Sequence, residues 1–223
     1  LFATGFASVV IASIVFWLTP KIVTKSKIEV VEPREISDLL KISRDTDEYW
    51  FSGGTAKFTR TVTIPELAKN ARRSNFSKKI TIIILDPRDE NLLNHYITYK
   101  NRVRSGKKSS WTVNRARQEL FATVVAAYIW ANEEPLLEIN VGFKNNVSLF
   151  RIDLSTNMVV ITKEDPQEPG LKCDSGTFFF KTYLEELRFS YSQSEKVEKI
   201  NYHITRDNID LSKVIGLLTA LKL

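Results

Sequence analysis

The chain begins with a long uncharged segment. Residues 1–18 read LFATGFASVVIASIVFWL and contain no charged side chain. A helix of this length, at about 1.5 Å rise per residue, spans roughly 28 Å, which is about the hydrocarbon thickness of a bilayer. Trp17 lies near one end, where interfacial aromatic residues are found, and lysines follow at positions 21, 25 and 27. The segment predicts a transmembrane helix over 1–20, with the main domain on the cytoplasmic side of the inner (plasma) membrane.

The alternative for this segment is a signal peptide, which carries its positive charge before the apolar run and a small-residue cleavage site after it. Here the charge follows the run, so a membrane span is favoured. Because position 1 is Leu, residues are expected upstream, and a single or a double pass both stay open. Gly5, Ser8 and Ala12 place small side chains along one helix face, which permits close helix pairing and a homo-oligomer, although such spacing also arises by chance.

Composition describes an ordinary folded domain after the anchor. Net charge is +6 at pH 7, and 26% of residues are charged. Cys173 is the single cysteine, so no internal disulfide forms, as expected in a reducing compartment, and its polar surroundings predict a surface thiol. With two histidines and no zinc motif, we expect no cofactor and no structural metal, while a magnesium site built from carboxylates stays open.

Hydrophobic periodicity predicts an α/β fold in which one mixed sheet carries helices. A juxtamembrane linker and a helix over 33–42 fill residues 21–46, and the α/β domain covers 47–223. Residues 79–85 (KITIIIL) are typical of a central strand that is buried on both faces. We also expect strands at 48–52, 136–143, 147–154 and 158–163, and helices at 65–74, 90–103, 112–132, 178–192 and 211–221, with the three phenylalanines 178–180 in the core.

The pattern SGGTAKFTRTV…ITIIILDPRDENL, followed by a late hairpin, resembles the first part of a phospholipase D-like domain over residues 48–187. In that family an HxKxxxxD motif supplies a nucleophilic or proton-shuttling His, a phosphate-gripping Lys and an orienting Asp. Here Asp153 fits the Asp, but Asn146 and Ser148 stand at the His and Lys positions. The resemblance therefore implies a domain for binding or assembly that lacks phosphodiesterase chemistry, because an amide is no nucleophile and a hydroxyl carries no charge.

A membrane anchor joined to such a domain also resembles, in architecture, the membrane effectors of bacterial phage-defence systems of the retron type. This resemblance implies a toxin-like antiviral effector.

A basic segment follows the helix at 90–103. Seven bases and one tryptophan, with no acid among them, fall within eighteen residues: Lys100, Arg102, Arg104, Lys107, Lys108, Trp111, Arg115 and Arg117. Bases with an interleaved aromatic bind phosphates and stack nucleobases, and the same composition faces anionic lipids or forms a solvated corner. We predict a contact with a partner or polyanion, with a protein or nucleoprotein complex as the expected partner.

A second candidate site is the turn after the strand at 48–52. Its backbone N–H groups can cradle an anion, although a tight turn of purely structural purpose gives the same pattern. Arg60 and Arg151 are the charges most able to converge there, and Asp153 shares a face with Arg151 two residues along its strand. The predicted ligand or anion site comprises Ser52, Gly53, Gly54, Thr55, Arg60, Arg151 and Asp153.

We therefore expect a membrane-anchored, non-catalytic effector or sensor subunit, whose cytoplasmic domain binds a partner or an anionic ligand and controls the anchor. No catalytic residue is assigned. Two alternatives stay open, a membrane-tethered phosphodiesterase or nuclease and a structural subunit of a membrane complex.

Overall fold

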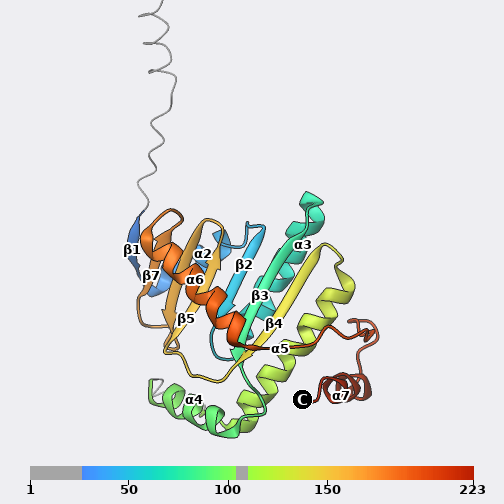
Figure 1. The fold of residues 1–223 in the computed structure, drawn as a ribbon. Coiled ribbons are helices and arrows are strands. Elements are labelled where there is room, and N and C mark those ends of the chain that lie inside the picture. The colour runs from blue at the N-terminus through green and yellow to red at the C-terminus, as the bar shows by residue number, and fades with distance from the viewer. Residues whose placement is uncertain (1–26, 104–109) are drawn as a thin grey trace, which may run out of the picture.

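The computed structural model describes residues 27–103 and 110–223, which form an eight-stranded sheet with helices on both faces (Figure 1). The strands are β1 (Ile28–Val31), β2 (Glu48–Ser52), β3 (Lys78–Leu85), β4 (Leu137–Lys144), β5 (Phe150–Ser155), β6 (Met158–Lys163), β7 (Gly170–Asp174) and β8 (Glu195–Lys196). The helices are α2 (Pro33–Ile42), the π-helical turn η1 (Thr59–Thr63), α3 (Ile64–Ser74), α4 (Glu90–Val103), α5 (Val113–Glu133), α6 (Phe178–Gln193) and α7 (Leu211–Ala220).

The strand order is β1-β7-β6-β5-β2-β3-β4-β8. Strands β2, β3 and β4 run parallel and are joined by helical crossovers, whereas β5, β6 and β7 form an antiparallel meander beside β2. Two short antiparallel strands, β1 and β8, close the edges. The carboxyl ends of the parallel strands are therefore the place where loops from both halves of the sheet can meet, as in other open α/β sheets.

Alternation along β6 separates the two faces of the sheet. Val159 and Ile161 pack with α6, whereas Met158 and Val160 pack with α2. The face of α2 is also covered by α3 and α5, which bury the central strand residues Ile80, Ile82 and Ile84. Helix α6 crosses the opposite face (Figure 1). The isoleucines of β3 are fully buried on both faces, which confirms the predicted central strand.

The structure contradicts the predicted fold class, a transmembrane helix joined to an α/β domain, and the inner-membrane localisation predicted from that helix. The described residues build a mixed α/β domain, and within 27–103 and 110–223 no helix combines the length and the apolar composition needed to cross a bilayer. Helices α2 and α3 are amphipathic and bury one face against the sheet, whereas α7 packs on α5. The transmembrane segment predicted at 1–20 lies outside the described residues.

The two elements in the predicted juxtamembrane region, β1 and α2, belong to the same folded domain as the sheet. Strand β1 pairs with β7, and α2 packs on β6 through Leu40. The predicted helix at 33–42 is confirmed residue for residue. Strand β7 is absent from the sequence-based expectations, because its sequence GLKCD shows no clean alternation.

Two side-chain predictions are wrong. Cys173 lies fully buried in β7 on the α6 face rather than at the surface, and burial raises the pKa of its thiol. Phe178 and Phe179 are exposed at the first turn of α6, while only Phe180 of this triplet reaches the core. A helix rotates successive side chains by about 100°, so three consecutive residues do not all face the sheet.

Candidate functional site

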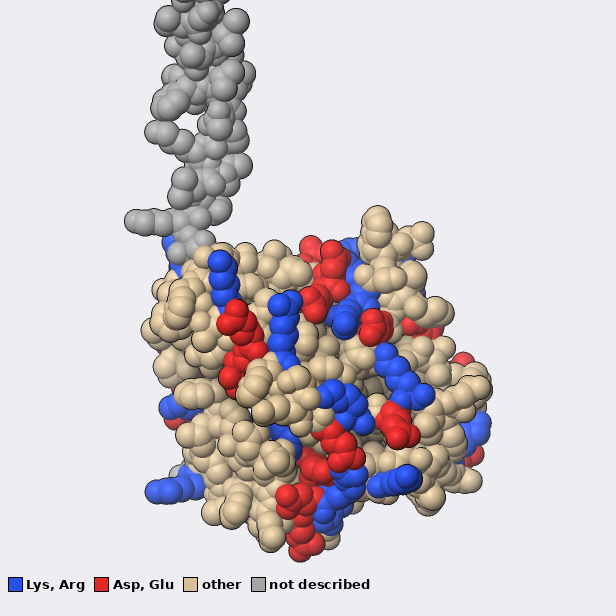
Figure 2. Space-filling view, in the orientation of Figure 1, with Lys and Arg blue, Asp and Glu red and all other residues tan. Residues whose placement is uncertain are grey.

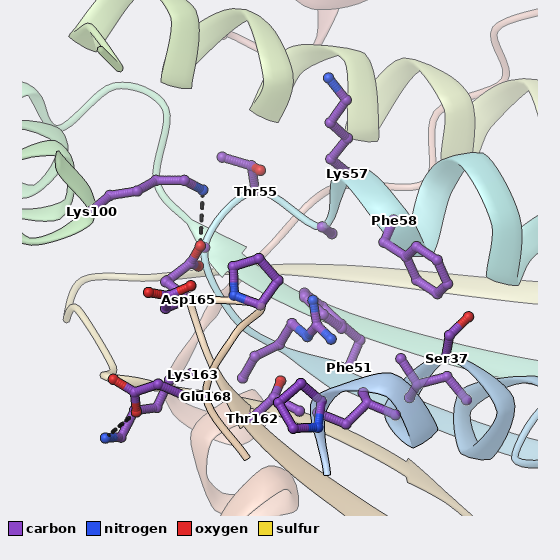
Figure 3. A pocket seen from close by; sticks show the side chains of 18 of the residues that line it. Ser37, Phe51, Thr55, Lys57, Phe58, Lys100, Thr162, Lys163, Asp165 and Glu168 are labelled. Atoms are coloured by element: carbon purple, nitrogen blue, oxygen red, sulfur yellow. Dashed lines mark ion pairs between the residues drawn. The ribbon is translucent and has the colours of Figure 1, made fainter. Parts of the chain in front are cut away.

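A cleft of about 500 Å³ opens beyond the carboxyl end of β2 (Figure 3). One wall is α2, the second is the segment Gly54–Thr61, and the third is the β6–β7 loop, residues 164–168. The floor comes from β5 and β6, through Arg151 and Thr162. Three segments that are distant in sequence therefore converge on one concave site, which is the usual form of a small-molecule site.

The double glycine is required by packing. A Cβ built on Gly54 would lie 2.7 Å from Cε2 of the buried Tyr96, and one on Gly53 would lie 2.7 Å from Cζ of Phe51. Neither distance is tolerated by a real side chain. The two glycines thus let the chain turn closely over Phe51 and Tyr96. Packing alone explains why both positions are glycine, as the alternative of a structural turn predicts.

The chain after the turn is locally strained. Ala56 adopts a left-handed conformation with φ of 54°, which costs energy for a residue with a Cβ. The helix that follows contains the π-helical turn η1, a geometry frequent at functional sites. Both features border the cleft, since Ala56, Phe58 and Thr61 line it.

Arg151 is held by a buried carboxylate. Its Nε donates to Asp153 at 3.1 Å, as the two-residue spacing on β5 predicts, and Asp153 also accepts from the Tyr49 hydroxyl at 2.8 Å. Burial raises the pKa of Asp153, and burial followed by the charge of Asp153 raises the pKa of Tyr49. The terminal NH groups of Arg151 hydrogen-bond to no residue in the described part of the chain, and the side chain is 28% exposed.

Thr162 lies directly opposite Arg151 in the β5–β6 register. It is 5% exposed, and its Oγ1 finds no hydrogen-bond partner within residues 27–103 and 110–223. A buried hydroxyl without a partner is costly, by roughly 1–3 kcal/mol. Figure 3 shows Thr162 on the floor of the cleft. The cross-strand pair thus combines an Arg fork with a hydroxyl donor whose hydrogen bond is not made.

A polar network closes the other end of the cleft. Glu164 accepts from Lys100 Nζ at 2.9 Å and from the Tyr96 hydroxyl at 3.2 Å. The Lys100 ammonium also lies 3.8 Å from the ring centroid of Trp111, a cation–π contact in a largely desolvated position. This network ties α4, the segment just before α5 and the β6–β7 loop together, and sequence reasoning missed it.

Another buried lysine, Lys144, lies beside Ser52 and outside the cleft lining. Lys144 ends β4, is 6% exposed, and donates to Ser52 Oγ at 3.2 Å. Burial lowers its pKa to about 8, partly offset by the charge of Glu164. Ser52 therefore faces Lys144 rather than an open anion site. In the sequence, the only sign of this contact is that Lys144 ends the strand LEINVGFK, whose last four residues are buried.

The pKa of Lys144 makes a pH-dependent prediction. Its folded value of about 8 lies below the ordinary 10.5, so the unfolded chain binds the proton more readily, and stability should rise as pH increases from 8 to 10.5. Lys144→Met should therefore raise the free energy of unfolding at pH 7 by about 2 kcal/mol, with the gain shrinking toward pH 10. Urea unfolding at pH 7, 8, 9 and 10 measures this difference. Lys199→Met, at a 66% exposed side chain, is the control, and a wild-type-to-variant difference that stays constant with pH would contradict the assignment.

Of the other residues predicted to bind an anion, some line the cleft and others point away from it. Gly54, Thr55 and Arg151 line it, and Asp153 lies beneath Arg151. Arg60 turns toward α5, where it binds Glu119 and the Thr123 hydroxyl. Lys57 shares the same carboxylate at 2.9 Å, and Figure 3 shows its side chain leading away from the floor.

The predicted basic contact segment is not one surface. Lys100 and Trp111 are buried beside the cleft, and Arg115 stacks over Trp111. Arg117 donates to the Pro87 carbonyl at 3.0 Å. Arg102 is exposed, while Arg104, Lys107 and Lys108 lie outside the described residues. On the face seen in Figure 2, basic and acidic side chains are interspersed.

The residues aligned with the phospholipase D-like motif do not meet in one site. Asn146 is exposed in the β4–β5 connection, and the Ser148 hydroxyl bonds the backbone of Phe150. Asp153, in contrast, is 1% exposed in the core. Within the described residues, no cluster of three or more His, Cys, Asp or Glu side chains has the geometry to hold a metal ion.

Comparisons with known proteins assign no family. No family model matches the chain, and no curated protein matches it. One solved structure with similarity is TrmBL2, an archaeal chromatin protein whose structure shows a novel mode of DNA binding; it has 12% identity and a TM-score of 0.41, over 87% of this chain and 63% of that one. The chain thus spans less than two thirds of that protein, and a TM-score of this size carries no argument about fold or function.

Proposed function

We propose that this domain is a non-catalytic sensor or effector module that binds a small anionic ligand in the cleft and communicates its occupancy to a protein partner. The observation that carries the proposal is the Arg151–Thr162 pair. Both residues line the floor of the cleft. The terminal NH groups of Arg151 bond to no described residue, and the buried hydroxyl of Thr162, opposite it, has no hydrogen-bond partner among the described residues. An anionic oxygen in the cleft can accept from the terminal NH groups of Arg151 and, after rotation of the Thr162 side chain, from the Thr162 hydroxyl, whose Oγ1 has no accessible surface in this structure.

The position of the cleft supports a signalling role. Its walls belong to α2, the strained start of the helix after β2, and the β6–β7 loop, so an occupant contacts three separate segments. A ligand that binds one arrangement of these segments better than another shifts the population between them. The dispersed positions of Asn146, Ser148 and Asp153 support binding over phosphodiester hydrolysis.

The test is thermal unfolding of the full chain with four probes: acetate, inorganic phosphate, benzoate and AMP. At about ten times its dissociation constant, a bound ligand stabilises the fold by roughly 1.4 kcal/mol, which corresponds to a few degrees in Tm. We expect at least one probe to raise the Tm of the wild type, and we expect Arg151→Gln to abolish most of that shift.

Two further variants make the result specific. Thr162→Val should reduce the same shift while leaving the unliganded protein at least as stable, because it removes a hydroxyl that lacks a partner in the described part of the chain. Lys199→Gln is the control, since Lys199 is 66% exposed, is paired with Glu138 at 3.5 Å outside the cleft lining, and should leave the shift unchanged. Equal responses of the wild type and Arg151→Gln to all four probes would refute the anion site.

A further inference from the structure

We infer that the ligand of this cleft is an amphipathic monocarboxylate, a molecule with a single carboxylate head and an apolar body. The inference rests on the proposed function and names its ligand class. It follows from three properties of the cleft: the number of cations at its floor, the sign of the charges on its loop, and the character of its walls.

Among the described residues, the floor offers one cation, Arg151. Three lysines also line the cleft, and the ammonium of each lies 2.5–2.9 Å from a carboxylate: Lys57 at Glu119, Lys100 at Glu164 and Lys163 at Glu168. Arg151 differs, because only its Nε contacts a carboxylate and its terminal NH groups hydrogen-bond to no described residue. A planar guanidinium edge with two parallel donors matches a carboxylate, which has the same planar two-oxygen geometry.

The loop over the cleft disfavours polyanions. Glu164, Asp165 and Glu168 all line the cleft from this loop. Glu164 and Glu168 are paired with Lys100 and Lys163, so an additional negative charge on a ligand finds each lining lysine already beside a carboxylate. A nucleoside triphosphate or a nucleic acid strand therefore fits the charge pattern less well than a singly charged head.

The walls offer an apolar surface for the rest of the ligand. Side chains from α2, β2, the following helix and the loop are hydrophobic: Pro33, Ile36, Leu40, Phe51, Phe58 and Pro166. Together with a volume of about 500 Å³, within the range of pockets that bury drug-sized molecules, they can enclose an alkyl chain or a flat ring. A free inorganic anion or a short polar acid leaves this surface uncovered.

The experiment compares four eight-carbon probes that differ only in the head group. Octanoate, octanol, octylamine and octyl phosphate are titrated calorimetrically into the full chain, below the concentrations at which they form micelles. We expect octanoate to bind most tightly. We also expect octanoate to bind about 15-fold more tightly than hexanoate, because each buried methylene contributes roughly a factor of four.

Variants locate the binding. Arg151→Gln should weaken octanoate binding by at least about tenfold, the size expected for a lost charge-assisted hydrogen bond, and should leave octanol unchanged. Phe58→Ser, in the apolar wall, should weaken all four probes. Phe178→Ala removes an aromatic ring that is 75% exposed on α6, away from the cleft lining, and should change nothing.

The outcomes separate the inference from the proposed function. Tighter binding of octyl phosphate than octanoate, with dependence on Arg151, would overturn the carboxylate assignment and leave the anion site standing. A second outcome has the same meaning: no octyl probe binds, but phosphate or AMP raises the Tm of the wild type and not of Arg151→Gln. The carboxylate assignment then fails and the anion site stands. Equal binding of octanol and octanoate, unaffected by Arg151→Gln, would overturn both.

Discussion

Gly54→Ala should lower the free energy of unfolding by about 3 kcal/mol, because the new methyl group would overlap the ring of Tyr96. Tyr96 is 1% exposed and is held by Lys100 and Glu164, so it cannot swing aside without breaking those contacts. The backbone at Gly54 is fixed as well, since its carbonyl accepts from Leu85 N at 3.3 Å. Urea unfolding monitored by tryptophan fluorescence measures the change.

A double-mutant cycle tests the stated cause. In a Tyr96→Leu background, Gly54→Ala should cost less than about 1 kcal/mol, because residues in contact couple strongly. Gly170→Ala is the control glycine: its new Cβ would meet Ile161 O at 3.1 Å and two side-chain methyl groups at 3.3 Å, so we expect a smaller loss than at Gly54. Additive effects of Gly54→Ala and Tyr96→Leu would show that the close approach to Tyr96 is not the reason for the glycine.

The second large effect is expected at Glu164. Glu164→Ala removes the carboxylate 2.9 Å from the ammonium of Lys100, which is 5% exposed. Breaking a buried ion pair from one side costs roughly 3–5 kcal/mol, since the remaining charge stays in a poorly solvated position. We expect about 3 kcal/mol here, at the lower end of that range, because Tyr96 and Trp111 still contact the ammonium.

Removing both charges should recover most of the loss. Lys100→Met/Glu164→Gln keeps side chains of similar volume and needs no ion pair, so we expect stability within about 1 kcal/mol of the wild type. Glu168→Ala is the matched loop control, because its partner Lys163 is 45% exposed and a surface ion pair contributes little. A double variant no more stable than Glu164→Ala would place the role of Glu164 outside the ion pair.

Features that depend on neighbours in the chain are predictable from the sequence. The apolar run of β3, the helix that starts at Pro33, and the shared face of Arg151 and Asp153 each follow from local periodicity, and each is confirmed. The structural alternative for Gly53 and Gly54 is also correct, although the side chains that require these glycines are not foreseeable from the sequence.

The site depends instead on contacts between distant residues, which local patterns do not reveal. Lys100 and Glu164 are far apart in the chain, so the basic segment resembles a surface in the sequence although Lys100 and Trp111 are buried. Thr162 is an ordinary threonine in an apolar strand, and only the β5–β6 register places it beside Arg151. The predicted membrane architecture rests on residues 1–18, which lie outside the described residues, and no helix of the described domain has the length and apolar composition to cross a bilayer.

The most direct test of the cleft is a crystal structure of the full chain with octanoate bound. The account predicts that the carboxylate lies within hydrogen-bond distance of the terminal nitrogens of Arg151 and of Thr162 Oγ1, with the alkyl chain against Phe58 and Ile36. A saturated complex whose octanoate lies elsewhere, for example in the apolar groove between α5 and the segment Val197–Ile200, would contradict it.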